Sequence, residues 1–311
     1  PMLCRPPMPA EPLITLAAGD LIVDVAPQLG GRVARFDHKV GGARQPIFTP
    51  ITDLDQDPAA PISGGCYPLV PFSNRIAGGR LAVAADSHRL AINEPARGHA
   101  LHGHGAWRPW QVTAHTDRRV DLTYTHDAGA AGWIWPYRAE MSLSLTARAL
   151  TWRLAVTNLH PSRAMPAGLG LHPYFADRDD GVLAGVVETI WPAGADRLPS
   201  GPAPVPGDLP LAGERPLPRG LDVGFGGWGG RAALDSAAGG WRVMMTGDDV
   251  FDHLVVYTPP DRGFFCVEPV SHAVDGFNLA ARGVAGTGRR DLAPGESLAG
   301  AVTFTVELAA D

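Results

Sequence analysis

The chain has 311 residues, of which 45% are hydrophobic and 19% charged, so it can bury the core of one large domain or of two average ones. Its 26 basic and 32 acidic residues leave a net charge of -6, which argues against a general nucleic-acid or acidic-membrane surface and favours a small neutral or cationic ligand. The sequence contains no run of about 18 apolar residues that would predict a membrane span. We therefore expect neither nucleic acid nor a membrane as a partner.

Residues 1–7 lack the basic stretch and apolar segment of a signal peptide, which predicts a cytoplasmic location. The three cysteines, Cys4, Cys66 and Cys266, are an odd number without CxxC spacing, and they predict neither a disulfide framework nor a zinc site. Lys39 is the only lysine and lies in a loop-like segment with two glycines, which argues against Schiff-base chemistry.

Apolar and polar residues alternate with a period of two in several runs, which predicts half-buried strands. In chain order these runs cover residues 21–25, 110–114, 120–124, 138–146, 152–156 and 302–308. Helical periodicity is scarce, and clusters of glycine, proline and aspartate separate the runs. The pattern predicts an all-β fold, a large antiparallel sandwich, with one domain over residues 1–311.

Two segments interrupt this rhythm, residues 49–61 and the proline-rich residues 192–218. Proline has no N–H group to donate to a strand ladder, so we expect the second segment to be a long surface excursion. Loops of this kind often border binding sites.

Glu268 is the most informative residue, because it follows the apolar run Phe264-Phe265-Cys266-Val267 and precedes a proline. A carboxylate in a strand that reads as buried is either a structural anion with satisfied donors or a general base whose pKa is raised by desolvation. Position alone favours the structural interpretation, since ion-pair networks also perturb buried carboxylates.

Histidines occur in two segments that are rich in glycine. His99, His102 and His104 lie close together, but no HExxH motif and no carboxylate at ligand spacing accompany them, so we expect no metal. We favour a hydrogen-bonding role, and a turn histidine without a functional role is the alternative. His172 is followed by Pro173, which favours an extended backbone and holds the imidazole in one direction. It is either a satisfied core histidine or a group that donates and recovers a proton.

Asn74 and Arg75 stand just before a glycine turn. Arginine offers several donors in a fixed arrangement that suits hydroxyls and carboxylates, and pairing with a carboxylate to hold a loop is the equally supported alternative. Glu268 as a candidate base and His172 as a candidate acid fit bifunctional proton transfer. A nucleophile is less supported, because the sequence has no GxSxG elbow.

These segments carry a resemblance to a known family. In order and over almost the full chain, the sequence resembles the aldose 1-epimerases, or mutarotases, of the galactose mutarotase-like superfamily. The motifs are Gly30-Gly31-Arg32-Val33, Asn74-Arg75-Ile76 with Gly78, Leu101-His102-Gly103 with Trp107, Leu171-His172-Pro173-Tyr174-Phe175, Leu221-Asp222, Val256-Tyr257-Thr258 and Val267-Glu268-Pro269. Each motif alone is weak, whereas the ordered set is specific. Glu268-Pro269 and Asp275-Gly276-Phe277-Asn278 are more similar to the bacterial branch.

The resemblance implies a β-supersandwich with an open sugar cleft, and interconversion of the α and β anomers of a free aldose without a cofactor. It implies that Glu268 is the general base for the anomeric hydroxyl and that His172 is the general acid for the ring oxygen. Ring opening, rotation about the C1–C2 bond and reclosure then yield the other anomer. The residues expected to hydrogen-bond the sugar are Arg75, His102 and Asp222, with Asn74 as a further candidate.

One position departs from the pattern, since Val255 stands where better-known members have glutamine. Because a site built to pair a hydroxyl discriminates through it, the choice between galactose and glucose stays open. The expected partner is a monosaccharide, and the expected state is a monomer or homodimer. Ring-stacking candidates are Trp107, Tyr174, Trp228 and Phe277.

Two other functions remain open. A hexose-phosphate mutarotase needs a cluster of basic side chains, to which Arg97 and Arg108 would contribute beside Arg75. A non-catalytic sugar-binding protein on the same scaffold would keep the cleft without turnover.

Overall fold

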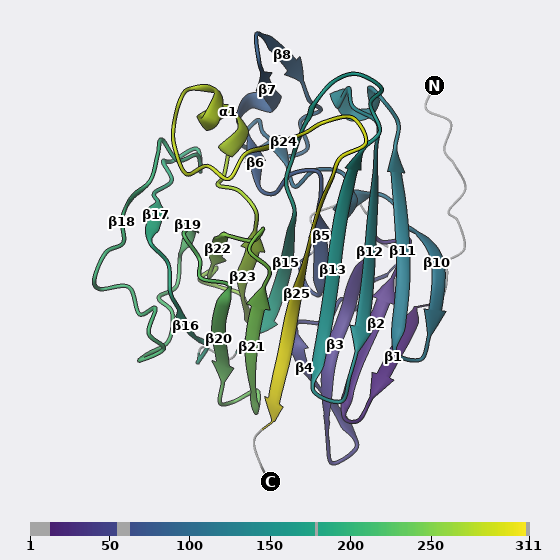
Figure 1. Cartoon of the computed structure of the whole chain (residues 1–311). Helices are drawn as coiled ribbons and strands as arrows, with labels where there is room; N and C mark the ends of the chain where they lie inside the picture. Colours follow the sequence, from purple (N-terminus) through teal and green to yellow (C-terminus); the bar gives the residue numbers. More distant parts are fainter. Residues whose placement is uncertain (1–12, 55–62, 178–179, 309–311) are drawn as a thin grey trace.

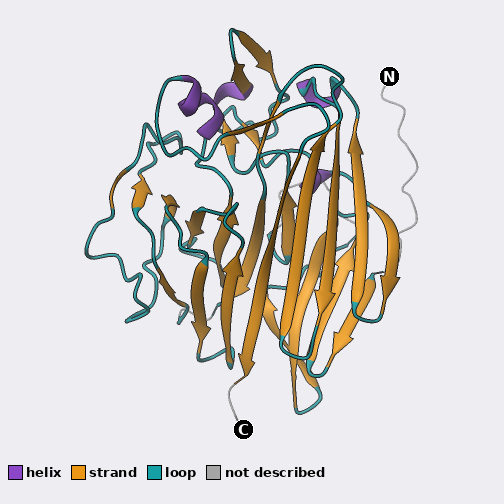
Figure 2. Ribbon diagram, viewed as in Figure 1, coloured by secondary structure: helices purple, strands orange, loops and turns teal. Residues whose placement is uncertain are grey.

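The structure is a computed structural model and describes residues 13–54, 63–177 and 180–308. In this part of the chain the strands form two large antiparallel sheets, stacked as two layers (Figure 1, Figure 2). The helices found there are one α-helix, α1 (Gly276–Ala281), and the short 3-10 helices η1 (Ala77–Gly79), η2 (Gly105–Trp107) and η3 (Ala130–Gly132). The prediction of an all-β antiparallel supersandwich is confirmed. No helix among the described residues is long and apolar enough to cross a membrane.

The first sheet has eleven strands and carries the site described below. Its strands, in hydrogen-bonding order, are β1 (Ile14–Ala18), β2 (Leu21–Ala26), β3 (Arg32–Val40), β4 (Ala43–Phe48), β15 (Gly170–Ala176), β23 (Phe264–Val270), β22 (His253–Tyr257), β19 (Asp222–Gly226), β17 (Thr189–Trp191) and β18 (Ala203–Pro204). The eleventh strand, β5 (Cys66–Leu69), pairs with both β3 and β15.

The second sheet has eight strands. In order they are β10 (Gln111–Thr116), β11 (Arg119–His126), β12 (Tyr137–Leu145), β13 (Ala149–Asn158), β25 (Ser297–Leu308), β21 (Trp241–Gly247), β20 (Arg231–Ser236) and β16 (Val182–Gly185). Small two-stranded sheets pair β6 (Arg75–Ile76) with β9 (Ala100–Leu101), β7 (Arg80–Val83) with β8 (Asp86–Arg89), and β14 (Met165–Ala167) with β24 (Arg290–Leu292). Figure 1 shows α1, β7 and β8 together at one end of the sandwich.

Alternate residues of the two sheets build the core between them. In β12 the odd-numbered residues from Tyr137 to Leu145 are buried, and the even-numbered ones are exposed or half-buried. Phe304 of β25 contacts Phe48 of β4 edge-on, with ring centroids 5.4 Å apart, so rings from the two sheets meet directly. Burial of these apolar faces supplies the main driving force for the sandwich.

The six strands expected from alternation are confirmed as β2, β10, β11, β12, β13 and β25. Among the predicted strand boundaries, the largest error is at the start of β25. Residues 297–301 there include small side chains that give no clear polar and apolar contrast. A few short helices were expected in this fold, but the position of α1, which begins inside the motif at residues 275–278, was not predicted. Of the first excursion, residues 55–61 lie outside the described residues. The second excursion carries one short strand, β18.

Candidate active site

The candidate site lies on the face of the first sheet that points away from the second sheet. In β23, Phe265 and Val267 belong to the main core, whereas Phe264 and Cys266 pack into a separate small apolar cluster. Successive residues of a strand face opposite sides, so Glu268 shares the face of Cys266. Register therefore turns this carboxylate away from the main core.

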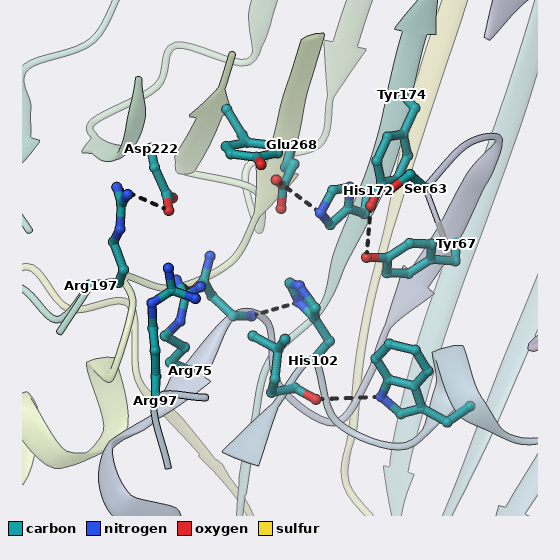
Figure 3. A pocket seen from close by; sticks show the side chains of 14 residues that line it. Ser63, Tyr67, Arg75, Arg97, His102, His172, Tyr174, Arg197, Asp222 and Glu268 are labelled. Carbon is teal, nitrogen blue, oxygen red and sulfur yellow. Dashed lines mark hydrogen bonds and ion pairs between the residues drawn. The ribbon is translucent and has the colours of Figure 1, made fainter. Parts of the chain in front are cut away.

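A cavity of about 240 Å³ opens on this face (Figure 3). All six residues expected at the site line it, and its lining is Ser63, Tyr67, Asn74, Arg75, Arg97, Leu101, His102, Trp107, His172, Tyr174, Arg197, Asp222, Tyr257 and Glu268. Residues that are far apart in the sequence thus meet in one hollow.

Glu268 and His172 form the chemical centre of the cavity. The β15–β23 register pairs Gly170 with Val270 and Tyr174 with Cys266, which leaves His172 opposite Glu268. The imidazole Nε2 lies 3.2 Å from the carboxyl Oε1, and both side chains are buried. The other carboxyl oxygen, Oε2, and the other ring nitrogen, Nδ1, have no hydrogen-bond partner among the described residues. Buried polar atoms normally have a hydrogen-bond partner, so these two unpaired atoms distinguish the His172–Glu268 pair from ordinary buried polar groups.

Burial shifts both groups toward their uncharged forms. Desolvation raises the pKa of Glu268 well above its usual value, Asp222 adds to the rise, and Arg75 opposes it. Desolvation and, to a smaller extent, the positive charge of Arg32 together lower the pKa of His172 to about 3. Both shifts favour the uncharged pair, with the proton on the Glu268 carboxyl group and a neutral His172 imidazole.

His102 is oriented by the backbone next to it. Its Nδ1 accepts a hydrogen bond of 3.1 Å from the amide of Asn74, which leaves the proton of the neutral ring on Nε2. Burial lowers the pKa of His102 well below its usual value, and His172 and Arg75 lower it further. The ring is therefore a neutral N–H donor on the wall of the cavity.

Arg75 is held rigidly beside the cavity. Its Nε and Nη2 donate to the two carboxyl oxygens of Glu94 at 2.8 and 2.9 Å, and its Nη1 donates to the Asn74 side chain at 3.2 Å. This bidentate pair fixes the plane of the guanidinium. The carboxylate pairing considered for Arg75 is confirmed, and the side chain also lines the cavity.

Two further arginines, Arg97 and Arg197, line the cavity. Arg97 donates to Glu94 at 3.0 Å, and Arg197 lies 3.4 Å from Asp222 (Figure 3). Arg197 comes from the proline-rich excursion and has a φ of +65°, a conformation that non-glycine residues seldom adopt. The expectation that this excursion borders a site is met by Arg197. Arg108 borders a neighbouring cavity of about 170 Å³ instead, so its expected contribution was wrong.

The aromatic candidates divide into two groups. Trp107 and Tyr174 line the cavity, whereas Trp228 and Phe277 are buried in the main core and do not. Tyr67 and Tyr257 also line the cavity and were not predicted. Tyr257 stood within a recognised motif, so its position was available as a signal. Nothing in the sequence around Tyr67 distinguished it from a core residue.

The three clustered histidines diverge, which removes the metal interpretation for them. His99 accepts from the Gly78 amide and its Nε2 lies 3.1 Å from the carbonyl of Asp196, whereas His104 bonds Tyr137 at 3.0 Å. Only His102 reaches the cavity.

A different group, His172, Cys266 and Glu268, brings its donor atoms within 4.8 Å of one another. Burial raises the pKa of the Cys266 thiol well above its usual value, so the thiol stays protonated, whereas metal ligation requires a thiolate.

Val255 lies beside Glu268 as its direct partner in the β22–β23 register. It is 3% exposed and packs in the small apolar cluster with Cys266 and Tyr174. The valine offers no hydrogen bond to the carboxyl group and helps to exclude water from it.

The fold and this cavity define a galactose mutarotase-like β-sandwich. The sequence profile of the family described as Aldose 1-epimerase matches residues 12–305. The chain belongs to the aldose 1-epimerase family.

Named relatives are consistent with this assignment. The uncharacterized protein YphB of Escherichia coli K12 is 31% identical over 313 aligned residues, which cover 95% of this chain and 99% of YphB. A crystal structure from Escherichia coli K12, reported as a candidate aldose 1-epimerase, is 29% identical, has a TM-score of 0.82 and covers 95% of this chain and 99% of its own. A galactose mutarotase-like protein from Clostridium acetobutylicum has a TM-score of 0.80 at 20% identity, covers 95% of both chains and shares the fold.

Proposed function

We propose that the protein is an aldose 1-epimerase that interconverts the α and β anomers of a free aldose. The observation that carries the proposal is the 3.2 Å approach of His172 Nε2 to Glu268 Oε1 inside a cavity that Arg75, His102 and Asp222 also line. General acid–base catalysis needs two such groups within reach of one substrate.

In the proposed reaction, the Glu268 carboxylate takes the proton of the anomeric hydroxyl while the His172 imidazolium protonates the ring oxygen. The C1–O5 bond breaks and the aldehyde forms. Rotation about C1–C2 presents the other face of the aldehyde, and reclosure returns both protons. Arg75, His102 and Asp222 hold the remaining hydroxyl groups, with Asn74 as a further contact, and no cofactor takes part.

Burial favours the uncharged pair, so this cycle requires the proton to move from Glu268 to His172. A pair that holds one proton becomes a carboxylate and an imidazolium when the proton moves from Glu268 to His172, so one transfer creates both the base and the acid. Because the two groups are coupled, the pair titrates as a unit. The active form has one proton on the pair, and activity falls when the pair gains or loses one.

The test follows α-glucose and α-galactose to anomeric equilibrium by polarimetry or NMR. The proposal expects acceleration over buffer for at least one free aldose, and comparison of the two sugars assigns the preference. Saturable sugar binding without acceleration would identify a non-catalytic sugar-binding protein instead.

A second candidate is a mutarotase for a phosphorylated hexose. The observation that favours it is that Arg97 and Arg197 join Arg75 at the cavity, so three guanidinium groups meet two partner carboxylates, Glu94 and Asp222. Guanidinium groups bind phosphate through paired hydrogen bonds. Glucose 6-phosphate would then equilibrate faster than glucose, and Arg197→Gln would slow the phosphorylated sugar selectively. Equal rates for both sugars would exclude this candidate.

The cytoplasmic location, the single domain over residues 1–311 and the monomeric or dimeric state stay predictions. Cell fractionation, limited proteolysis and analytical ultracentrifugation test them in turn.

A further inference from the structure

Arg32 is a buried cation that the proposed reaction does not use. Its exposed fraction is 0%, and no ion pair of Arg32 occurs among the described residues. Its Nε donates to the carbonyl of Leu29 at 2.9 Å and its Nη2 to the carbonyl of Ala106 at 3.1 Å, while Nη1 has no partner in this part of the chain. A buried charge without a counter-ion is costly and rarely kept without a function.

The glycines before Arg32 explain how the cation is held. Gly30 has a φ of +74°, and a Cβ there would lie 2.1 Å from the Ala106 carbonyl oxygen. Glycine therefore permits the close approach of the same carbonyl that binds Nη2. The Gly-Gly-Arg motif therefore provides both the guanidinium and the backbone conformation that lets the Ala106 carbonyl bind it.

The ring of Tyr67 lies between Arg32 and His172, the proposed acid. Its guanidinium carbon lies 4.5 Å from the ring centroid of Tyr67, and that ring stacks on His172 with centroids 4.7 Å apart. The two distances sum to 9.2 Å, which bounds the separation between the charge and the imidazole centroid. The cation–π contact also holds the tyrosine in place.

We propose that Arg32 is a positioning residue: it holds the Tyr67 ring against His172 and places a permanent positive charge near the imidazole. The proposal rests on the proposed epimerase function for its kinetic consequences. A nearby cation destabilises the imidazolium, so His172 becomes a stronger acid toward the ring oxygen. At an effective dielectric of about 20, a charge roughly 9 Å away changes acid strength by about twentyfold.

Other groups also face His172, and the test must separate them from Arg32. They are Glu268 on β23, Tyr67 on β5, Tyr174 on β15, His102 after β9, and the thiols of Cys66 and Cys266. Both tyrosines and both cysteines have pKa values raised by burial, and burial keeps His102 neutral. Arg32 is therefore the permanent positive charge of the set.

The experiment compares Arg32→Met, Arg32→Gln and Arg32→Lys with the wild type. Arg35→Met is the matched control, because Arg35 lies on the same strand but pairs with Asp37 and is one-third exposed. NMR titration of the His172 imidazole is the first readout, and the pH profile of kcat with KM is the second. The glutamine variant keeps a donor for the two carbonyls, so it guards against a methionine variant that fails to fold.

The neutral variants should titrate His172 at higher pH, move the acid limb of the profile upward and lower kcat about tenfold, with KM changed less than about twofold. Arg32→Lys should stay nearer to the wild type, and Arg35→Met should match it. Folded neutral variants with an unchanged His172 titration would overturn the proposal. The NMR readout needs no turnover, so an inactive wild type would remove the epimerase function alone.

Discussion

Two clusters of this molecule contain the same side chains, two histidines and two tyrosines, and differ in what their polar atoms contact. The cavity cluster is His102, His172, Tyr67 and Tyr174, and the packed cluster is His104, His126, Tyr124 and Tyr137. In the packed cluster His104 bonds Tyr137, and His126 bonds both Tyr124 and the carbonyl of Ala130. In the cavity cluster His172 leaves Nδ1 without a partner among the described residues and turns Nε2 toward Glu268.

A shifted pKa does not by itself distinguish a catalytic histidine from a structural one. Burial lowers the pKa of His104 and of His126, as it lowers the pKa of His172. What distinguishes His172 is an unsatisfied ring beside a buried carboxyl group in a cavity. The packed cluster uses the same residue types for stability.

The largest expected effect is that of Glu268→Gln. Loss of the proposed base should lower kcat about 10³- to 10⁴-fold while sugar binding stays largely intact, because the amide keeps the shape of the carboxyl group. Polarimetry gives the rate, and calorimetry gives the sugar affinity. Glu140→Gln, at an exposed site on the second sheet, is the control. A Glu268→Gln variant with the full rate would remove Glu268 from the mechanism.

His172→Asn should lower kcat about 10²- to 10³-fold, since the sugar ring oxygen loses its proposed proton donor. Thermal melting should show that the variant is folded. A wild-type rate would show that His172, like the histidines of the packed cluster, has a structural role and takes no part in catalysis.

His104→Phe should have the opposite effect, a loss of stability with little change in kcat. The ring is kept, but the bond to Tyr137 is lost in a buried place, which costs about 1–2 kcal/mol of stability. The free energy of unfolding from urea denaturation should fall, with kcat within about twofold of the wild type. A large loss of kcat in a stably folded variant would contradict the division between the clusters.

Glu268→Gln should also stabilise the fold, with a gain that depends on pH. The pKa of Glu268 is raised in the folded state, so its favourable contribution is complete below the unfolded-state pKa and is lost as pH rises through the folded-state pKa. The melting temperature of the variant should therefore exceed that of the wild type increasingly toward alkaline pH. A constant difference across pH would show that Glu268 is not destabilised by ionisation.

Val255→Gln should have the smallest effect. An amide beside Glu268 can donate to the carboxylate, which lowers its pKa and moves the alkaline limb of the pH profile to lower pH. KM for one of the two hexoses should change about two- to tenfold. Val255→Ile, which keeps the site apolar, is the control. If the alkaline limb of the pH profile does not move in the glutamine variant, position 255 does not influence the proposed base.

Much of the fold could be predicted from local pattern. The strict alternation of β12 and β11 is visible in the sequence, because one face of each strand is buried and the other is not. The helix α1 could not be predicted, since its six residues are too few to show a helical period. Arg197 was missed at the cavity because its excursion has no pattern, and Arg108 was misplaced because nearness in sequence to the histidines does not fix direction.

By itself the sequence determined the all-β class, the family resemblance, and a carboxyl group and a histidine placed where a simple core needs neither. The tertiary structure alone decided that Glu268 faces His172, that His104 turns into a packed cluster, and that Arg32 stands behind Tyr67. The physical reason is register. A one-residue shift in strand pairing would turn Arg32, His172 and Glu268 to the other face of the sheet, and only the long-range hydrogen-bond ladder selects between the two faces.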